Sequence, residues 1–363
     1  MVSVEAFCPL IDIKHDQENP PRHEGLCWDS MVFIMSSLGP ILNTILPVFI
    51  TAGIGFIISR FALPRIVRAS RDRSPTLDAD VGDSTAPVEE GIRKFLHSLT
   101  FNFAGPPYIL AALWTSTVTL SDLGTPAVVS TILYLVMVLV AYAVGGLGRW
   151  SPDETKAAAL SLASTNCGNY GLPVLLLAFG EDGLVLGAVF VVAHVLAHLT
   201  VGLGIASWNK DRSFSRQLVH LLKYPYIYAI GLGLLLRSFD IEPPLAVSRS
   251  LDLIGSLWIP LMLLLLGMEL ERVRIALVWK KAAVLSAIKL LAPPLIAWGI
   301  TTLLGISGWV QAVLVVECSM PTAVNGLLLA RQCNTRPDLV ASTLLLSTLG
   351  SIFTLSALLV ILA

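Results

Sequence analysis

Two short polar interruptions in otherwise apolar segments hold the residues that could bind a ligand. The first runs Asn166-Cys-Gly-Asn169-Tyr-Gly171-Leu-Pro173, and the second runs Glu317-Cys-Ser-Met-Pro321-Thr-Ala-Val-Asn325. Proline, glycine and polar side chains interrupt a membrane helix and free backbone N–H and C=O groups, which hydrocarbon tolerates only where they line a cavity or a binding site. A break that recurs in both halves of a chain is typical of a transporter's substrate site.

The amide side chains at these breaks suit a negatively charged ligand. Each break creates a helix N-terminus inside the membrane, whose free N–H groups and positive dipole end attract carboxylates. Asn166, Asn169 and Asn325 can donate hydrogen bonds without adding charge, so we predict that they bind substrate. The alternative is that these amides only cap the freed backbone groups. The predicted substrate site also includes the helix-breaking residues Gly171, Pro173 and Pro321.

Two charged residues lie inside apolar segments. Glu317 precedes the second break by four residues, and an ionised carboxylate is costly there. We predict that Glu317 exchanges a proton or Na⁺ during transport; no other cofactor is expected. The alternative is a static pair with Lys289 or with helix ends. Lys289 lies four residues before Pro293, and two roles stay open for it: attraction of the substrate anion, or snorkelling to the cytoplasmic face.

The remaining reactive side chains do not indicate catalysis. His194 and His198 are four residues apart, a spacing that could hold a metal, but the sequence offers no further ligand nearby, so we expect interhelical hydrogen bonds instead. The five cysteines form no disulfide framework, although Cys8 and Cys27 could pair outside the cell. The embedded residues include no carboxylate pair, no serine with a base and no His-x-x-Glu-His motif. We therefore predict that the protein is not an enzyme.

Composition identifies the elements that must position these residues. Hydrophobic residues make up 55% of the 363 residues, charged residues 13%, and the mean hydropathy is +0.77, which indicates a membrane protein surrounded by lipid. Nothing indicates nucleic-acid binding. Spanning the hydrocarbon takes about 20 apolar residues in a helix. We predict an all-α polytopic protein with ten such segments, at residues 41–59, 99–120, 125–147, 156–179, 183–208, 216–236, 251–269, 282–306, 308–330 and 338–363.

The distribution of Lys and Arg predicts the orientation. Of the 24 basic residues, 19 fall in the loops after the first, third, fifth, seventh and ninth segments. Short basic loops stay cytoplasmic, so both termini are predicted to be extracytoplasmic in the plasma (inner) membrane. Each half has five helices, an odd number, so the two halves should be inverted repeats. The first half is 41–208, with a cytoplasmic linker 60–94, and the second is 209–363. Residues 1–40 are either an extracytoplasmic polar tail or a gene-model extension, with translation starting at Met31 or Met35.

Three stretches carry a resemblance to a known family. They are Asn166 seven residues before Pro173, the run Leu-Leu-Leu-Leu-Gly267-Met-Glu-Leu, and the stretch from Pro321 through Asn325 to Asn334-Thr-Arg-Pro337-Asp338. From about residue 40 to its end the chain resembles the auxin efflux carrier family. That family includes bacterial malate and malonate permeases and is related to the bile acid/sodium symporters.

The resemblance implies a scaffold domain and a transport domain, with the broken fourth and ninth helices crossing and an elevator-like movement of their crossing point. It also implies a homodimer formed through the scaffold helices. Lys289 resembles a basic residue that the family often has there. Glu317 departs from the plant carriers, where the position looks like Gln, and this departure bears on coupling.

These features together predict a secondary transporter of a small organic anion, such as malate, malonate or an auxin-like acid, working by alternating access. An anion channel or a non-transporting membrane receptor on the same scaffold is the alternative. A channel usually shows repeated rings of charged or carbonyl groups, whereas this chain offers two breaks and one embedded acid.

Overall fold

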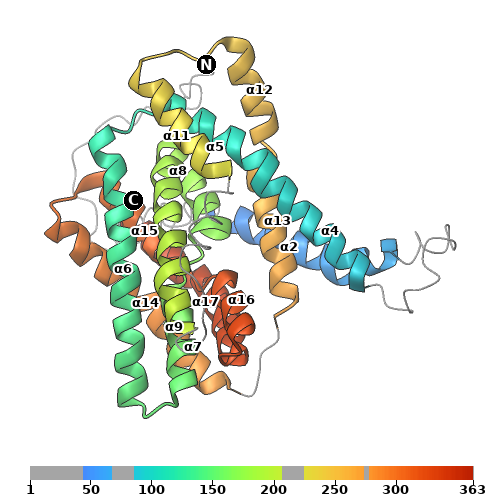
Figure 1. The fold of residues 1–363 in the computed structure, drawn as a ribbon, viewed down its shortest axis with the longest axis vertical. Helices are drawn as coiled ribbons and strands as arrows, with labels where there is room; N and C mark the ends of the chain where they lie inside the picture. The colour runs from blue at the N-terminus through green and yellow to red at the C-terminus, as the bar shows by residue number, and fades with distance from the viewer. Residues whose placement is uncertain (1–43, 68–85, 207–224, 274–277, 363) are drawn as a thin grey trace, which may run out of the picture. The chain divides into compact units, whose positions relative to one another are not determined.

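The computed structural model describes residues 44–67, 86–206, 225–273 and 278–362 (Figure 1). Within these ranges the chain is almost entirely helical and has no β-strand, so the all-α class is confirmed for them. Six helical segments are long and apolar enough to cross a membrane: Leu46–Val67, Ser121–Leu147, Cys167–Ala206, Leu245–Glu271, Trp279–Leu303 and Pro337–Leu362. The protein is therefore an integral membrane protein, whereas ten spans and inverted repeats stay predictions.

The first half consists of long helices with local departures from α geometry. These helices are α2 (Leu46–Ile57), α4 (Ala86–Ser98), α5 (Gly105–Thr115), α6 (Leu120–Leu147), α7 (Pro152–Ala163), α8 (Leu172–Ala197) and α9 (Leu203–Ala206). A π-helical stretch, Leu99–Ala104, joins α4 to α5 without a break. Helix therefore extends into both ends of the predicted linker 60–94; residues 68–85 lie outside the described ranges.

The predicted boundary between the fourth and fifth segments falls inside α8. Gly180 has φ of +70°, a left-handed conformation that glycine adopts without steric cost, and it kinks the helix there. Upstream, Ser151 and Glu154 form a reciprocal capping box that fixes the start of α7. The kink and the cap define the ends of the segment that carries the first break.

The second half follows the same pattern of long and interrupted helices. Its helices are α11 (Pro225–Ser238), α12 (Leu245–Gly255), α13 (Trp258–Glu271), α14 (Trp279–Leu303), α15 (Gly308–Cys318), α16 (Val324–Cys333) and α17 (Pro337–Leu362). Asn334 ends α16 in a left-handed conformation, which Asn tolerates better than most residues. The N-terminal part of the predicted sixth segment, up to residue 224, lies outside the described ranges.

The helices pack as two groups. The α2 group contains α2, α4, α5, α11, α12 and α13, and the α6 group contains α6 to α9 and α14 to α17. The principal contacts between the groups join α5 and α13 to α8 and to the turn before it. The closest approach within the α2 group is at Gly267, where an added Cβ would lie 1.7 Å from the carbonyl oxygen of Ala52. Small residues permit this backbone-to-backbone packing.

Ion pairs and hydrogen bonds of charged side chains join the helices within each group. In the α2 group, Arg93 donates to the carbonyl oxygen of Met268 and pairs with Glu271. In the α6 group, Glu154 pairs with Lys281 from α14 and with Arg336 before α17. The hydrogen bond from Lys281 is the main reason that the pKa of Glu154 is lowered. Each network joins helices of one group only.

Candidate functional site

The two predicted breaks meet in the α6 group. Between α7 and α8 the chain is extended at Thr165, and between α15 and α16 it is extended at Thr322; these two residues form an antiparallel β-bridge. The backbone N–H of Asn166 donates to the carbonyl oxygen of Pro321 at 2.8 Å, and the backbone N–H of Ala323 donates to the carbonyl oxygen of Ser164 at 2.9 Å. Each break therefore supplies hydrogen-bond partners for some of the N–H and C=O groups that the other break leaves unpaired. Such groups need partners in the hydrocarbon region, where no water is present.

Side chains from α8 and α14 satisfy more of the first break. The amide of Thr165 donates to Nε2 of His194 at 2.9 Å. Because Nε2 accepts this bond, the imidazole is neutral and carries its proton on Nδ1. The Nζ atom of Lys289 donates to the Thr165 hydroxyl at 2.7 Å and to the carbonyl oxygen of Leu162 at 3.0 Å. Lys289 is fully buried, so the snorkelling alternative is wrong for this conformation.

His198 binds next to His194 on the same face. Its Nδ1 lies 3.1 Å from the hydroxyl of Ser164 and 3.2 Å from the hydroxyl of Tyr134 on α6. Both histidines thus make the interhelical hydrogen bonds expected from the sequence. They hold the first break against α8.

The three predicted asparagines line one cavity of about 270 Å³. The side chains of Asn166 and Asn325 make no hydrogen bond within the described residues, and Asn166 does not cap the helix that follows it. The capping alternative therefore does not describe these amides here. The Nδ2 atom of Asn169 donates to Oε2 of Glu269 at 3.4 Å.

The cavity lies where both helix groups contribute side chains. The α6 group supplies the two breaks and α8, including Thr165, Leu172, Ala188 and Val191; the α2 group supplies α5, α11 and α13, including Ile109, Ile230, Trp258, Met262 and Glu269. Two helix N-termini, at Cys167–Asn169 and Ala323–Asn325, form part of the wall. The N–H of Ala323 already donates to Ser164, but the next N–H groups, such as those of Gly168 and Val324, have no intrahelical acceptor, so they can donate to a bound ligand.

The other predicted site residues lie outside the cavity wall. Pro173 begins α8, and Pro321 contributes its carbonyl oxygen to the pairing of the breaks, so both shape the backbone. Gly171 provides space, because an added Cβ would lie 2.4 Å from Oε2 of Glu317. Lys289 donates a hydrogen bond to Thr165 of the first break and is not among the cavity-lining residues.

Glu317 lies beside Gly171 of the first break and is enclosed by the protein. It is fully buried, and neither carboxylate oxygen has a hydrogen-bond partner within the described residues. It forms no ion pair with Lys289 there, whose Nζ bonds to Thr165, so the static pair is not present. A bare carboxylate is unstable in such surroundings, and the position favours a proton or a bound cation.

The sequence interpretation missed Glu269, a second embedded carboxylate. It lies in the run Gly267-Met-Glu-Leu, which we used only as a family motif, and an acid near the end of an apolar run was the available signal.

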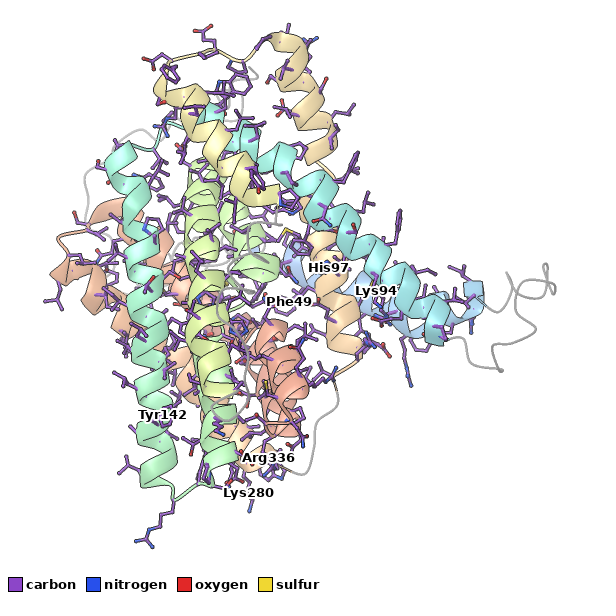
Figure 2. The ribbon with its side chains drawn as sticks, viewed as in Figure 1. Phe49, Lys94, His97, Tyr142, Lys280 and Arg336 are labelled. Carbon is purple, nitrogen blue, oxygen red and sulfur yellow. The ribbon has the colours of Figure 1, made fainter. Side chains whose placement is uncertain are left out.

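Glu269 and His97 also line a second cavity of about 190 Å³, which we call the vestibule. Four basic side chains line the vestibule: Arg93, Lys94, Arg272 and Arg331. Figure 2 shows Lys94 and His97 together on α4.

Known proteins are similar over most of this chain. A family described as "Membrane transport protein" matches residues 88–359. An uncharacterized transporter of Methanothermobacter thermautotrophicus is 27% identical over 261 residues, which cover 72% of this chain and 86% of the relative. An uncharacterized transporter of Methanocaldococcus jannaschii is 28% identical over 285 residues, covering 74% and 89%. A Rhizobium meliloti protein named "Putative malonate transporter" is 25% identical over 251 residues, covering 66% and 75%.

The family match covers about three quarters of the chain and includes both breaks, the apolar run at Gly267 and the segment that follows α16. These are the features on which the resemblance to the auxin efflux carriers depended. The chain therefore belongs to the membrane transport protein family, the family of the auxin efflux carriers.

Proposed function

We propose that this protein is a secondary carrier that moves a small carboxylate-bearing metabolite across the membrane by alternating access. The observation that carries the proposal is the cavity at the paired breaks, where the unbonded amides of Asn166 and Asn325 lie beside two helix N-termini. Uncharged donors of this kind bind a carboxylate without adding a charge of their own to the empty site. The name of the Rhizobium relative supports a small organic acid as the substrate class.

The arrangement suggests how the cycle proceeds. Basic side chains of the vestibule attract an anion, which then passes Glu269 and His97 into the cavity. The α6 group, which carries both breaks, moves against the α2 group and exposes the site to the other side. Glu317 carries a proton or Na⁺ with this movement, because its burial makes an unneutralised charge unfavourable. We place the carrier in the plasma (inner) membrane as a homodimer, with both termini extracytoplasmic.

Reconstitution tests the proposal against the channel and receptor alternatives. The purified full chain is placed in proteoliposomes, and uptake of labelled monocarboxylates, dicarboxylates and amino acids is measured with and without a proton or Na⁺ gradient. A carrier gives saturable uptake that unlabelled substrate inside the vesicles accelerates. Flux without saturation or counter-exchange would identify a channel, and binding without flux would identify a receptor.

Single amide substitutions test the site itself. Asn166→Ala and Asn325→Ala each remove a donor to a charged group, a loss of about 1.5–3 kcal/mol, so the dissociation constant should rise about tenfold to hundredfold. Calorimetric titration in detergent measures this, and thermal unfolding shows whether the variants fold. Asn102→Ala is the matched control, because Asn102 is exposed and, among the described residues, its side chain bonds Ser98 alone. Unchanged affinity in both site variants would remove these amides from substrate binding.

A further inference from the structure

The charge pattern of the cavity is unusual for a site that receives an anion. Among the residues described, its wall includes a carboxylate, Glu269, and neither Lys nor Arg. Lys289 lies behind the break, and its Nζ atom is engaged by Thr165 and Leu162. The donors available to a ligand carboxylate are therefore uncharged amides and backbone N–H groups, which suffice for one carboxylate.

Glu269 marks the end of the cavity that faces the vestibule. It lines both cavities, whereas Asn166 and Asn325 line only the first. One of its oxygens accepts the long bond from Asn169, which leaves most of the acceptor positions of the carboxylate free. The wall thus places a charged acceptor, Glu269, beside the donors of the first break.

The nearby basic residues Arg93 and Arg272 form their ion pairs with other carboxylates and none with Glu269 within the described ranges. Arg93 donates to Met268 and Ser59 and pairs with Glu271, and Arg272 pairs with Glu90. None of the ion pairs within the described ranges includes Glu269. A second carboxylate on a ligand would therefore meet a like charge at this end, whereas an ammonium group would meet a partner.

We propose that Glu269 makes this site selective for zwitterionic monocarboxylates of the amino-acid type, with the ligand carboxylate at the paired breaks and its ammonium group at Glu269. This inference rests on the proposed carrier function and narrows its substrate class. The rest of the wall is largely apolar, with Ile109, Val191, Ile230 and Met262 among its members, so the side chain that the ligand carries on its α-carbon is apolar.

Three ligands that differ at one position test the proposal. L-leucine, 4-methylpentanoate and 2-isobutylmalonate share an isobutyl body and one carboxylate, and carry an ammonium group, a hydrogen or a second carboxylate on the α-carbon. Titration of the purified full chain near neutral pH should give leucine the lowest dissociation constant, about tenfold or more below that of 4-methylpentanoate. Isobutylmalonate should bind most weakly.

Glu269→Gln should reverse the preference. The amide keeps the size of the side chain and removes its charge, so leucine binding weakens about tenfold or more while isobutylmalonate binding tightens. Glu242→Gln makes the same change at an exposed position outside both cavities and should leave the order of the three ligands as in the wild type.

The outcomes separate this inference from the carrier proposal. If the wild type binds isobutylmalonate as well as leucine, or Glu269→Gln leaves the order unchanged, the role of Glu269 is overturned and the carrier proposal stands. If Glu269→Gln does not fold, the order measured with the wild type alone decides. If none of the three ligands binds and no carboxylate is transported, both proposals fail.

Discussion

At the residue scale, the side chains near the breaks divide into those that hold the backbone and those that face the cavity. His194 and Lys289 donate to or accept from the first break, and this leaves Asn166 and Asn325 free to meet a ligand. The sequence predicted that these residues act together, because breaks, amides and embedded charges are visible as residue types. It did not distinguish the side chains that hold the backbone from those that face the cavity, since that depends on which neighbour lies within hydrogen-bond distance.

Glu317→Gln tests coupling at this scale. A buried carboxylate without a partner favours a proton or a cation, whereas an amide of the same size cannot be protonated and has no negative charge to hold a cation. We expect the variant to lose the dependence of uptake on the proton or Na⁺ gradient while it still exchanges substrate across the membrane. Proteoliposome uptake with and without each gradient measures this, with the exposed Glu242→Gln as the control. Wild-type gradient dependence in Glu317→Gln would exclude the residue from coupling.

At the element scale, the interrupted helices α7–α8 and α15–α16 are stable because each break is paired with the other. The long helices of the α2 group are held instead by close backbone contact between α2 and α13. Helix positions followed from apolar runs, proline and glycine, so nearly every described element lies near its predicted segment. The linker differed, because helix continues to Val67 and begins again at Ala86. Charged residues lower the mean hydropathy of α4, so a search for long apolar runs passed over its strongly amphipathic pattern.

Gly267→Ala tests the contact between α2 and α13. The added methyl group would collide with the backbone of Ala52, which cannot rotate away, so we expect a loss of about 1–3 kcal/mol and a lower unfolding temperature in detergent. Gly53→Ala is the matched control on α2, since no atom lies within 4 Å of its added Cβ. Equal unfolding temperatures for the two variants would contradict this packing.

At the scale of the whole molecule, the described helices form two groups, each with its own charged network, and the cavity lies where they meet. The elevator-like movement implied by the family requires the α6 group to move against the α2 group. The aromatic rings of Phe49 on α2 and Tyr170 in the first break touch edge to face across this boundary, with centroids 5.8 Å apart. This contact must open if the groups move.

A cross-link across the boundary should therefore stop transport. Cysteines at Phe49 and Tyr170, in a background with the native cysteines replaced by serine, can be joined through disulfide bonds to a bis-methanethiosulfonate cross-linker that spans the space of the two rings, and released with a reducing agent. We expect substrate uptake to fall to the level of empty vesicles when the cross-link forms and to recover on reduction. Cysteines at Glu154 and Arg336 lie within the α6 group and provide the control, since that link should permit transport. Full uptake through the Phe49–Tyr170 link would rule out relative movement there.

The sequence by itself determined the membrane class, the family and the two breaks, because hydrophobic length, helix-breaking residues and embedded charges act locally along the chain. Only the tertiary structure decided four other properties. These are the pairing of the breaks, the position of Lys289 behind them, the burial of Glu317 and the presence of Glu269 in the cavity wall. Those properties depend on contacts between residues more than 90 positions apart, such as Asn169 with Glu269. Only the packing of the helices brings such residues together.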